Sequence, residues 1–337
     1  MSERPLRVLA VTNLWPERGS FRGVFVKEQV EAVRDLGHQV EVEVVAQSRG
    51  KADYLLAAPR VCHRVRTGGY DLVHVHYGLT ALAGRFAFGV PRVLSLYGSD
   101  VNVGWQRLAA SLGRGGVTAR IYPSRRLAEA AGDPAGYVVP NGVDFGVFAP
   151  VDRAQARAAL GIGADDRVVL FGAAPDNPVK GYDVFTDVLA EVRRRGVEAR
   201  ELVLARPDQT RAEVARRFAA ADVLLLTSRK GTESGPLVVK EAAVMGLPVV
   251  SVDVGDVAEV LAGVTPSAVV GFPEPWGTPG ARAELVRQLA DATAGLLATP
   301  TRSDGRERCG FLDARAVAQQ LVGVYLEVLK VTGSTAR

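Results

Sequence analysis

The sequence predicts an α/β protein built from two doubly wound domains. Strand-like apolar runs alternate with helical patterns along almost the whole chain of 337 residues, which is typical of parallel sheets with crossover helices. The alternation pauses at a turn-rich stretch, residues 140–150, and then begins again. The length is sufficient for two hydrophobic cores. We therefore expect two parallel sheets, one in each half of the chain.

The first half contains six short apolar runs. They predict strands at residues 6–12, 40–45, 72–76, 92–97, 118–122 and 137–139. After the first run, Val26, Val30 and Val33 recur at helical spacing, which predicts an amphipathic helix over residues 23–36. In the third run, His74 and His76 are two residues apart, so both face the same side of the strand.

The second half repeats the alternation. Strands are expected at residues 167–171, 201–204, 223–226, 248–252 and 268–270. Helices are expected at residues 182–195, 211–220, 237–245, 282–297 and 314–329. Ligands of doubly wound sheets bind beyond the carboxyl ends of the strands, so we expect the site in a cleft between the two domains.

Composition and charge exclude several classes of function. The net charge of +4 is spread over single and paired arginines without a long basic run, so we expect no nucleic-acid partner. Cys62 and Cys309 lie far apart, which argues against disulfides and zinc sites and favours a reducing compartment. No run reaches the about 20 apolar residues that a membrane span needs. We expect a cytoplasmic protein without an integral membrane segment.

The most informative stretch is a loop that leads into the helix at residues 237–245. Pro236 fits the first position of this helix, so the N–H groups of Leu237 and Val238 would point outward at the positive end of the helix dipole. Such a helix start, reached through Gly235, suits a phosphate. Glu233 precedes the helix and Glu241 lies inside it, and carboxylates accept hydrogen bonds from hydroxyl groups. Phosphate and hydroxyls together indicate a nucleotide-sugar ligand.

These features resemble the retaining glycosyltransferases of family 4, which have two Rossmann-like domains facing across a cleft, the GT-B fold. Glu233 and Glu241, eight positions apart, match the E-x7-E motif of that family. Four further segments support the resemblance, namely Tyr97-Gly-Ser-Asp100, Val139-Pro-Asn-Gly-Val-Asp144, Lys180-Gly181 and Gly19-Ser-Phe-Arg-Gly23. The resemblance implies an acceptor-side domain at 1–145, a nucleotide-sugar domain at 146–310 and a C-terminal segment, 311–337, whose helix packs back toward the first domain.

The resemblance also implies roles for the donor-side residues. Glu241 would hold the ribose hydroxyls, and Glu233 those of the transferred sugar. Lys180 would neutralise the charge that develops on the departing diphosphate. Together with Glu233 it is our candidate catalytic residue, and Gly235, Leu237 and Val238 are candidate donor contacts.

Further donor-side candidates come from a departure from the family pattern and from a loop flanked by glycines. The family usually carries an arginine where this chain has Ala173. Arg206, or the pair Arg229-Lys230, could supply the missing positive charge. Gly19 and Gly23 flank a loop after the first strand, and glycines let the backbone approach a ligand closely. The resemblance implies that this loop closes on the donor phosphates and on the acceptor.

The acceptor side has three candidates. Tyr97 stands where family members often have histidine, and it can still form a hydrogen bond with a sugar. Asp100 could orient an acceptor hydroxyl or cap the next helix, and we leave both readings open. His76 lies at the carboxyl end of its strand and is a candidate acceptor contact, whereas His74 is expected to be a satisfied core residue.

The resulting expectation is a retaining hexosyltransferase of bacterial type. It would move a sugar from a nucleotide-diphosphate sugar, most simply a UDP-sugar, to a hydroxyl of a small natural-product core or a glycan. No metal or other cofactor is expected, and peripheral contact with a membrane stays open. Two alternatives are a nucleotide-sugar epimerase on the same fold and a non-catalytic partner that binds the nucleotide sugar.

Overall fold

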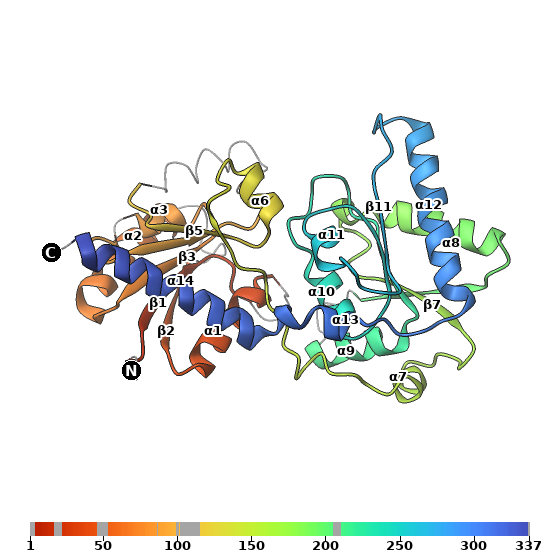
Figure 1. Cartoon of the computed structure of the whole chain (residues 1–337), viewed down its shortest axis with the longest axis horizontal. Helices are drawn as coiled ribbons and strands as arrows, with labels where there is room; N and C mark the ends of the chain where they lie inside the picture. Colours follow the sequence, from red (N-terminus) through yellow and green to blue (C-terminus); the bar gives the residue numbers. More distant parts are fainter. Residues whose placement is uncertain are drawn as a thin grey trace. The chain divides into compact units, whose positions relative to one another are not determined.

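The computed structural model describes residues 4–16, 22–45, 53–85, 87–98, 101, 115–204 and 210–335. The chain divides into two compact units (Figure 1). Unit 1 contains residues 1–142 and 314–337, and unit 2 contains residues 143–313. Both units are built around parallel sheets, as the sequence predicts.

Unit 1 holds a sheet of six strands in the order β2-β1-β3-β4-β5-β6. Its elements are β1 (Arg7–Thr12), α1 (Val24–Asp35), β2 (Gln39–Val44), α2 (Asp53–Gly68), β3 (Leu72–His76), α3 (Ala81–Gly84), β4 (Arg92–Ser95), β5 (Ala119–Tyr122), α6 (Arg125–Ala130), β6 (Tyr137–Val138) and α14 (Ala314–Thr335). The predicted strands agree with these bounds to within two residues at each end. In the register of the sheet, His76 lies between Thr12 of β1 and Ser95 of β4.

The C-terminal helix α14 covers one face of this sheet. Its residues Val317, Leu321 and Tyr325 join the same buried cluster as Val30 and Val33 of α1. Figure 1 shows α14 lying across the unit beside α1. The other face packs against α2, α3 and α6. Unit 1 is therefore completed by residues that follow unit 2 in the sequence.

Helix α1 begins where its sequence predicts, because Gly23 makes the turn that precedes it. Gly23 has a φ of 78°, in the left-handed region that glycine adopts readily. A side chain there would place its Cβ 2.3 Å from the carbonyl carbon of Leu14, so no other residue fits. The predicted apolar face is confirmed, since Val26, Val30 and Val33 are buried.

Unit 2 holds a sheet of five strands in the order β11-β10-β9-β7-β8. Its elements are α7 (Arg153–Ala159), β7 (Arg167–Phe171), the 3-10 helix η2 (Pro178–Lys180), α8 (Tyr182–Arg194), β8 (Ala199–Val203), α9 (Arg211–Ala220), β9 (Val223–Leu226), α10 (Leu237–Val244), β10 (Val249–Val252), α11 (Val257–Val260), β11 (Ala268–Val270), α12 (Pro279–Ala298), α13 (Gly305–Arg308) and the 3-10 helix η3 (Gly310–Leu312). Figure 1 shows α8 and α12 on one side of the sheet and α9 and α10 on the other.

The core of unit 2 is a single buried cluster around β7, β9 and β10. Strands β9 and β10 are buried along their whole length, which explains why they are continuous apolar runs. The loops after β7 and β9 leave the same edge of the sheet, because the two strands are parallel neighbours. This edge carries most of the predicted donor-side residues.

Candidate functional site

Two predicted catalytic residues meet at the carboxyl edge of the sheet in unit 2. Lys180 follows β7, Glu233 follows β9, and Lys180 Nζ lies 2.6 Å from Glu233 Oε1. Ser228, which also follows β9, donates a hydrogen bond of 2.8 Å to the same oxygen. The lysine side chain is about one quarter exposed, so the pair is open to a ligand. One cation and one carboxylate are therefore held together at the end of the sheet.

The position of Lys180 is fixed by the glycine that follows it. Gly181 has a φ of 67° and separates η2 from α8. A Cβ at this position would lie 2.1 Å from the carbonyl oxygen of Thr227. The hydroxyl of Thr227 donates a hydrogen bond of 2.9 Å to the Gly181 carbonyl, and Arg229 N donates one of 2.8 Å to the Val179 carbonyl. The loops after β7 and β9 are thus joined directly.

Helix α10 begins at Leu237, the first residue of the predicted range 237–245. Pro236 is the cap residue with a ψ of 110°, which is extended backbone, and Leu237 is the first helical residue. The prediction that Pro236 occupies the first helical position was wrong, since a proline φ of −66° suits either position. No side chain caps this helix, and the first N–H groups of a helix have no partner within it. The N–H groups of Leu237 and Val238 thus lie at an uncapped helix start.

Gly235 lies in a confined part of the same loop. A Cβ there would be 2.9 Å from Asp256 Oδ2, so a larger residue would displace the Asp256 side chain. Asp256 pairs with Lys240, whose Nζ lies 2.6 Å from Asp256 Oδ2. Both side chains are buried, Lys240 completely, and burial raises the pKa of the Asp256 carboxyl while Lys240 opposes the rise. A buried ion pair therefore lies next to the loop that leads from Glu233 to α10.

Glu241 is buried one turn into α10, with 3% of its surface exposed. Arg211 Nη2, from the first turn of α9, lies 2.7 Å from Glu241 Oε1. Burial raises the pKa of the Glu241 carboxyl, and the Arg211 guanidinium opposes this rise. The sequence did not single out Arg211, Ser228, Lys240 or Asp256. A usable signal existed for Lys240, a lysine in the otherwise apolar run before Glu241.

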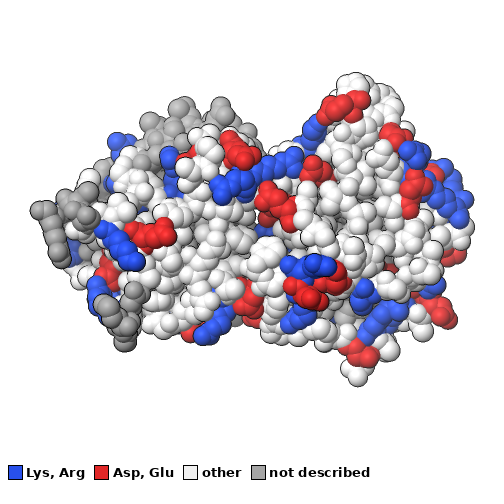
Figure 2. Space-filling model, in the orientation of Figure 1, with Lys and Arg blue, Asp and Glu red and all other residues white. Residues whose placement is uncertain are grey.

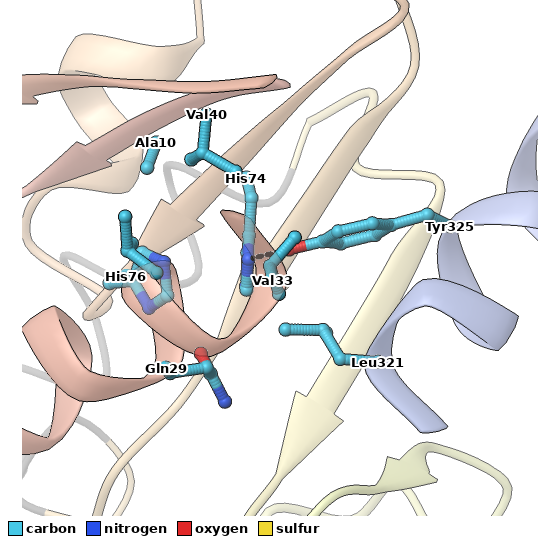
Figure 3. Close-up of a pocket in the computed structure, with 9 residues that line it drawn as sticks. Ala10, Gln29, Val33, Val40, His74, His76, Leu321 and Tyr325 are labelled. Atoms are coloured by element: carbon cyan, nitrogen blue, oxygen red, sulfur yellow. Dashed lines mark hydrogen bonds between the residues drawn. The ribbon is translucent and has the colours of Figure 1, made fainter. Parts of the chain in front are cut away.

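In unit 1, the buried side chains of His74, His76 and Tyr325 lie close together (Figure 3), and the partly buried Tyr97 contacts His76. His74 shares hydrogen bonds of 2.7 Å with the hydroxyl of Tyr325 and 2.8 Å with that of Ser95, which confirms it as a satisfied core residue. His76 shares a hydrogen bond of 2.8 Å with the hydroxyl of Tyr97. Burial lowers the pKa of His76 to about 3, so its imidazole is neutral near pH 7.

A small cavity of about 10 Å³ lies beside the two histidines. His74 and His76 from β3, Gln29 from α1 and Tyr325 from α14 contribute to its wall (Figure 3). His76 is 1% exposed, so Tyr97 is the member of the His76–Tyr97 pair that lies nearer the surface. The role of both residues in acceptor binding stays a prediction.

Three predicted site residues, Gly19, Arg206 and Asp100, lie outside the described residues. Of the other cations considered for the donor, Arg229 pairs with Asp183 at 2.9 Å and Lys230 pairs with Glu274, all four side chains being largely exposed. Both cations are thus paired on the surface, and the part that either would play in donor binding stays a prediction.

The described part of the chain carries a mixed surface charge (Figure 2). Figure 2 shows basic and acidic side chains mixed over the face in view. No helix within the described ranges combines the length and hydropathy needed to cross a bilayer. In those ranges, no three His, Cys, Asp or Glu side chains are grouped so that they could hold a metal ion. Metal-independent activity stays a prediction.

The chain is similar in sequence to known glycosyltransferases. Residues 22–146 match the profile of Glycosyltransferase Family 4, and residues 205–297 match that of Glycosyl transferases group 1. A D-inositol 3-phosphate glycosyltransferase of Actinosynnema mirum is 31% identical in an alignment 287 residues long, and the match covers 69% of this chain and 68% of the relative. One of Segniliparus rotundus is 29% identical in an alignment 316 residues long, and the match covers 77% of this chain and 67% of the relative. The matches thus span about two thirds of these relatives.

Solved structures show the same fold. Sucrose-phosphate synthase from Thermosynechococcus elongatus superposes with a TM-score of 0.74 at 17% identity, over 97% of this chain and 100% of that one. HepE of Anabaena, solved in complex with UDP and glucose, has a TM-score of 0.63 at 19% identity, over 95% of this chain and 99% of that one. Both likenesses concern the fold alone. In this fold, called GT-B, each of two α/β units holds a parallel sheet.

Proposed function

Because the chain belongs to glycosyltransferase family 4, and so is a glycosyltransferase, we propose that its donor is a nucleotide-diphosphate sugar and that transfer retains the anomeric configuration. The observation that carries this proposal is the contact of 2.6 Å between Lys180 and Glu233 beside the start of α10. A cation, a carboxylate and an uncapped helix start on one sheet edge suit a ligand that has both phosphates and hydroxyls.

Each of these groups has a distinct part in the proposed reaction. The N–H groups of Leu237 and Val238 bind the diphosphate, and Lys180 stabilises the negative charge that grows on it as the bond to the sugar breaks. Glu233 accepts hydrogen bonds from the transferred sugar, and Glu241 accepts them from the ribose. A helix dipole contributes only about 0.3–1 kcal/mol when exposed and ~2 kcal/mol when sheltered, so the cation carries most of the stabilisation.

The acceptor is proposed to be a hydroxyl group on a small, soluble molecule or a glycan. This hydroxyl group would approach the sugar from the same face that the diphosphate leaves. The departing diphosphate would then help to take up the proton of that hydroxyl group. The protein then mainly orients the two substrates. Two relatives of this chain are named D-inositol 3-phosphate glycosyltransferases, which makes a phosphorylated cyclitol the first acceptor to test.

The proposal is tested with the purified chain and a panel of UDP-, GDP- and ADP-sugars, each with and without acceptor. Release of nucleoside diphosphate that depends on the acceptor, with an unchanged anomeric configuration in the product, supports it. Conversion of the donor without acceptor would instead identify an epimerase. Tight nucleotide binding with no turnover against any acceptor would identify a non-catalytic binding protein.

A further inference from the structure

Glu241 is a buried carboxyl group, and burial disfavours its charged form. It is 3% exposed, and burial raises the pKa of its carboxyl. A buried carboxylate either pairs with a cation or takes up a proton. The two forms differ in what they offer a ligand, since the ionised form accepts hydrogen bonds at both oxygens while the protonated form donates from one of them. The ionisation state of Glu241 therefore decides how well it receives hydroxyl groups.

Arg211 is the cation that meets this carboxylate. Its Nη2 atom lies 2.7 Å from Glu241 Oε1, and its side chain is 20% exposed. The two groups form a close ion pair, and the charge of Arg211 opposes the effect of burial on the Glu241 carboxyl. The guanidinium thus favours the ionised carboxylate.

The position of Arg211 is fixed by its surroundings. Its guanidinium carbon lies 4.6 Å from the centre of the Phe148 ring, within the range of a cation–π contact. Arg211 is also the first residue of α9, whose start is held by a reciprocal capping box between Thr210 and Glu213. Arg211 therefore reaches Glu241 from a different helix, and both its side chain and the start of that helix are held by further contacts.

The neighbouring cation on α10 is paired with another carboxylate. Lys240, its neighbour on α10, is turned to Asp256 at 2.6 Å, and both of those side chains are buried. Among the described residues, Arg211 is the cation paired with Glu241. Removing its charge would leave a buried carboxylate without its counter-ion.

We propose that Arg211 is a positioning residue of the donor site, which keeps Glu241 ionised and ready to accept the hydroxyl groups of the donor's ribose. Arg211 acts through Glu241 and need not touch the ligand. The inference rests on the proposed donor site. It adds a residue that the E-x7-E spacing does not indicate.

The test compares UDP binding to the wild type and to Arg211→Met by calorimetry between about pH 6 and pH 9. Loss of the guanidinium raises the pKa of Glu241 further, so the variant binds UDP about tenfold or more weakly at pH 6, since an opposite charge shifts a carboxyl pKa by about 1–3 units. As the pH rises and Glu241 ionises, the ratio of the two dissociation constants returns toward one. Taking this ratio cancels the titration of UDP itself.

Three variants separate this effect from a structural one. Arg211→Lys keeps the charge, so the ratio of its dissociation constant for UDP to that of the wild type should not change with pH. Arg216→Met removes an exposed arginine from the same helix and should bind UDP like the wild type. In a Glu241→Gln background, Arg211→Met should cause no further loss, because the two residues act through one interaction.

The outcomes are distinct. A loss of affinity for Arg211→Met that is equal at every pH, or that persists in the Glu241→Gln background, would overturn the role of Arg211 while leaving the donor site intact. A wild-type chain that binds no nucleoside diphosphate at any pH would overturn both the donor site and this inference.

Discussion

Lys180 Nζ lies 2.6 Å from Glu233 Oε1, although the two residues are 53 positions apart in the sequence. The contact joins the loop after β7 to the loop after β9, and Ser228 donates a second hydrogen bond to the same carboxylate oxygen. Glu233 therefore orients the ammonium group, while the remaining protons of Lys180 stay available to a phosphate.

Replacing Lys180 with methionine is expected to lower kcat by about 100-fold or more, as does removal of one group that stabilises developing charge. The donor KM should change much less, because the cation acts mainly on the leaving group. Initial rates of nucleoside diphosphate release give both constants. The matched control is Lys330→Met, an exposed lysine on α14, whose rates should equal those of the wild type.

The contact between Lys180 and Glu233 also predicts that their effects do not add. Since the residues touch, Lys180→Met and Glu233→Gln together should lower kcat by less than the product of the two single losses. Additive effects in this double-mutant cycle would mean that the two side chains act independently during the reaction.

Replacing Gly181 with alanine should harm both stability and activity. Its φ of 67° costs a residue with a side chain about 1–2 kcal/mol, and the new methyl group would also collide with the Thr227 carbonyl. Gly196 is the control, because it has a φ of 84° and open space where a Cβ would lie. Urea unfolding should show a larger loss for Gly181→Ala than for Gly196→Ala, and only the former should lower kcat. Equal losses would show that Gly181 does not hold Lys180 in place.

The buried pair of Lys240 and Asp256 should be important for the stability of unit 2. Lys240→Met leaves a buried carboxylate without its partner, which typically lowers the free energy of unfolding by about 3–5 kcal/mol. Adding Asp256→Asn removes the orphaned charge and should restore part of the loss, as measured by denaturant titration. In the exposed pair of Lys27 and Glu31, Lys27→Met should change stability by less than about 1 kcal/mol. A small effect for both lysines would contradict this prediction.

Acid should destabilise unit 1 through its buried histidines. The pKa of His76 is about 3 in the folded chain, and an unfolded histidine titrates near 6.5. Between these two values the unfolded state binds more protons, so stability is present above about pH 6.5 and falls as the pH drops toward 3. For this one group, the free energy of unfolding changes by at most about 1.4 kcal/mol per pH unit. Urea unfolding of His76→Gln between about pH 6.5 and 5 should show a shallower slope than the wild type, and an unchanged slope would refute the assignment.

The sequence predicted those parts of the molecule that follow from local pattern. Continuous apolar runs located β9 and β10, and valines at helical spacing located the buried face of α1. The spacing of two between His74 and His76 placed their rings on the same side of β3, with centroids 3.9 Å apart. These features depend on residues that are close together in the chain.

The contacts that shape the site could not be read in the same way. Arg211 and Glu241 are 30 positions apart and meet only because α9 and α10 pack in the same unit. Pro236 was assigned to the first helical position instead of the cap position, because proline fixes φ but leaves ψ open, and at Pro236 ψ is extended. The contact between Arg211 and Glu241 and the ψ angle of Pro236 both depend on how the unit folds. Local sequence patterns therefore do not predict them.

A crystal structure with a bound nucleotide sugar that cannot be transferred is the most direct test of the account. It should show the diphosphate at the N–H groups of Leu237 and Val238 beside Lys180, with ribose hydroxyls on Glu241 and sugar hydroxyls on Glu233. A ligand bound at another place, with both glutamates making no contact to it, would contradict the proposed donor site.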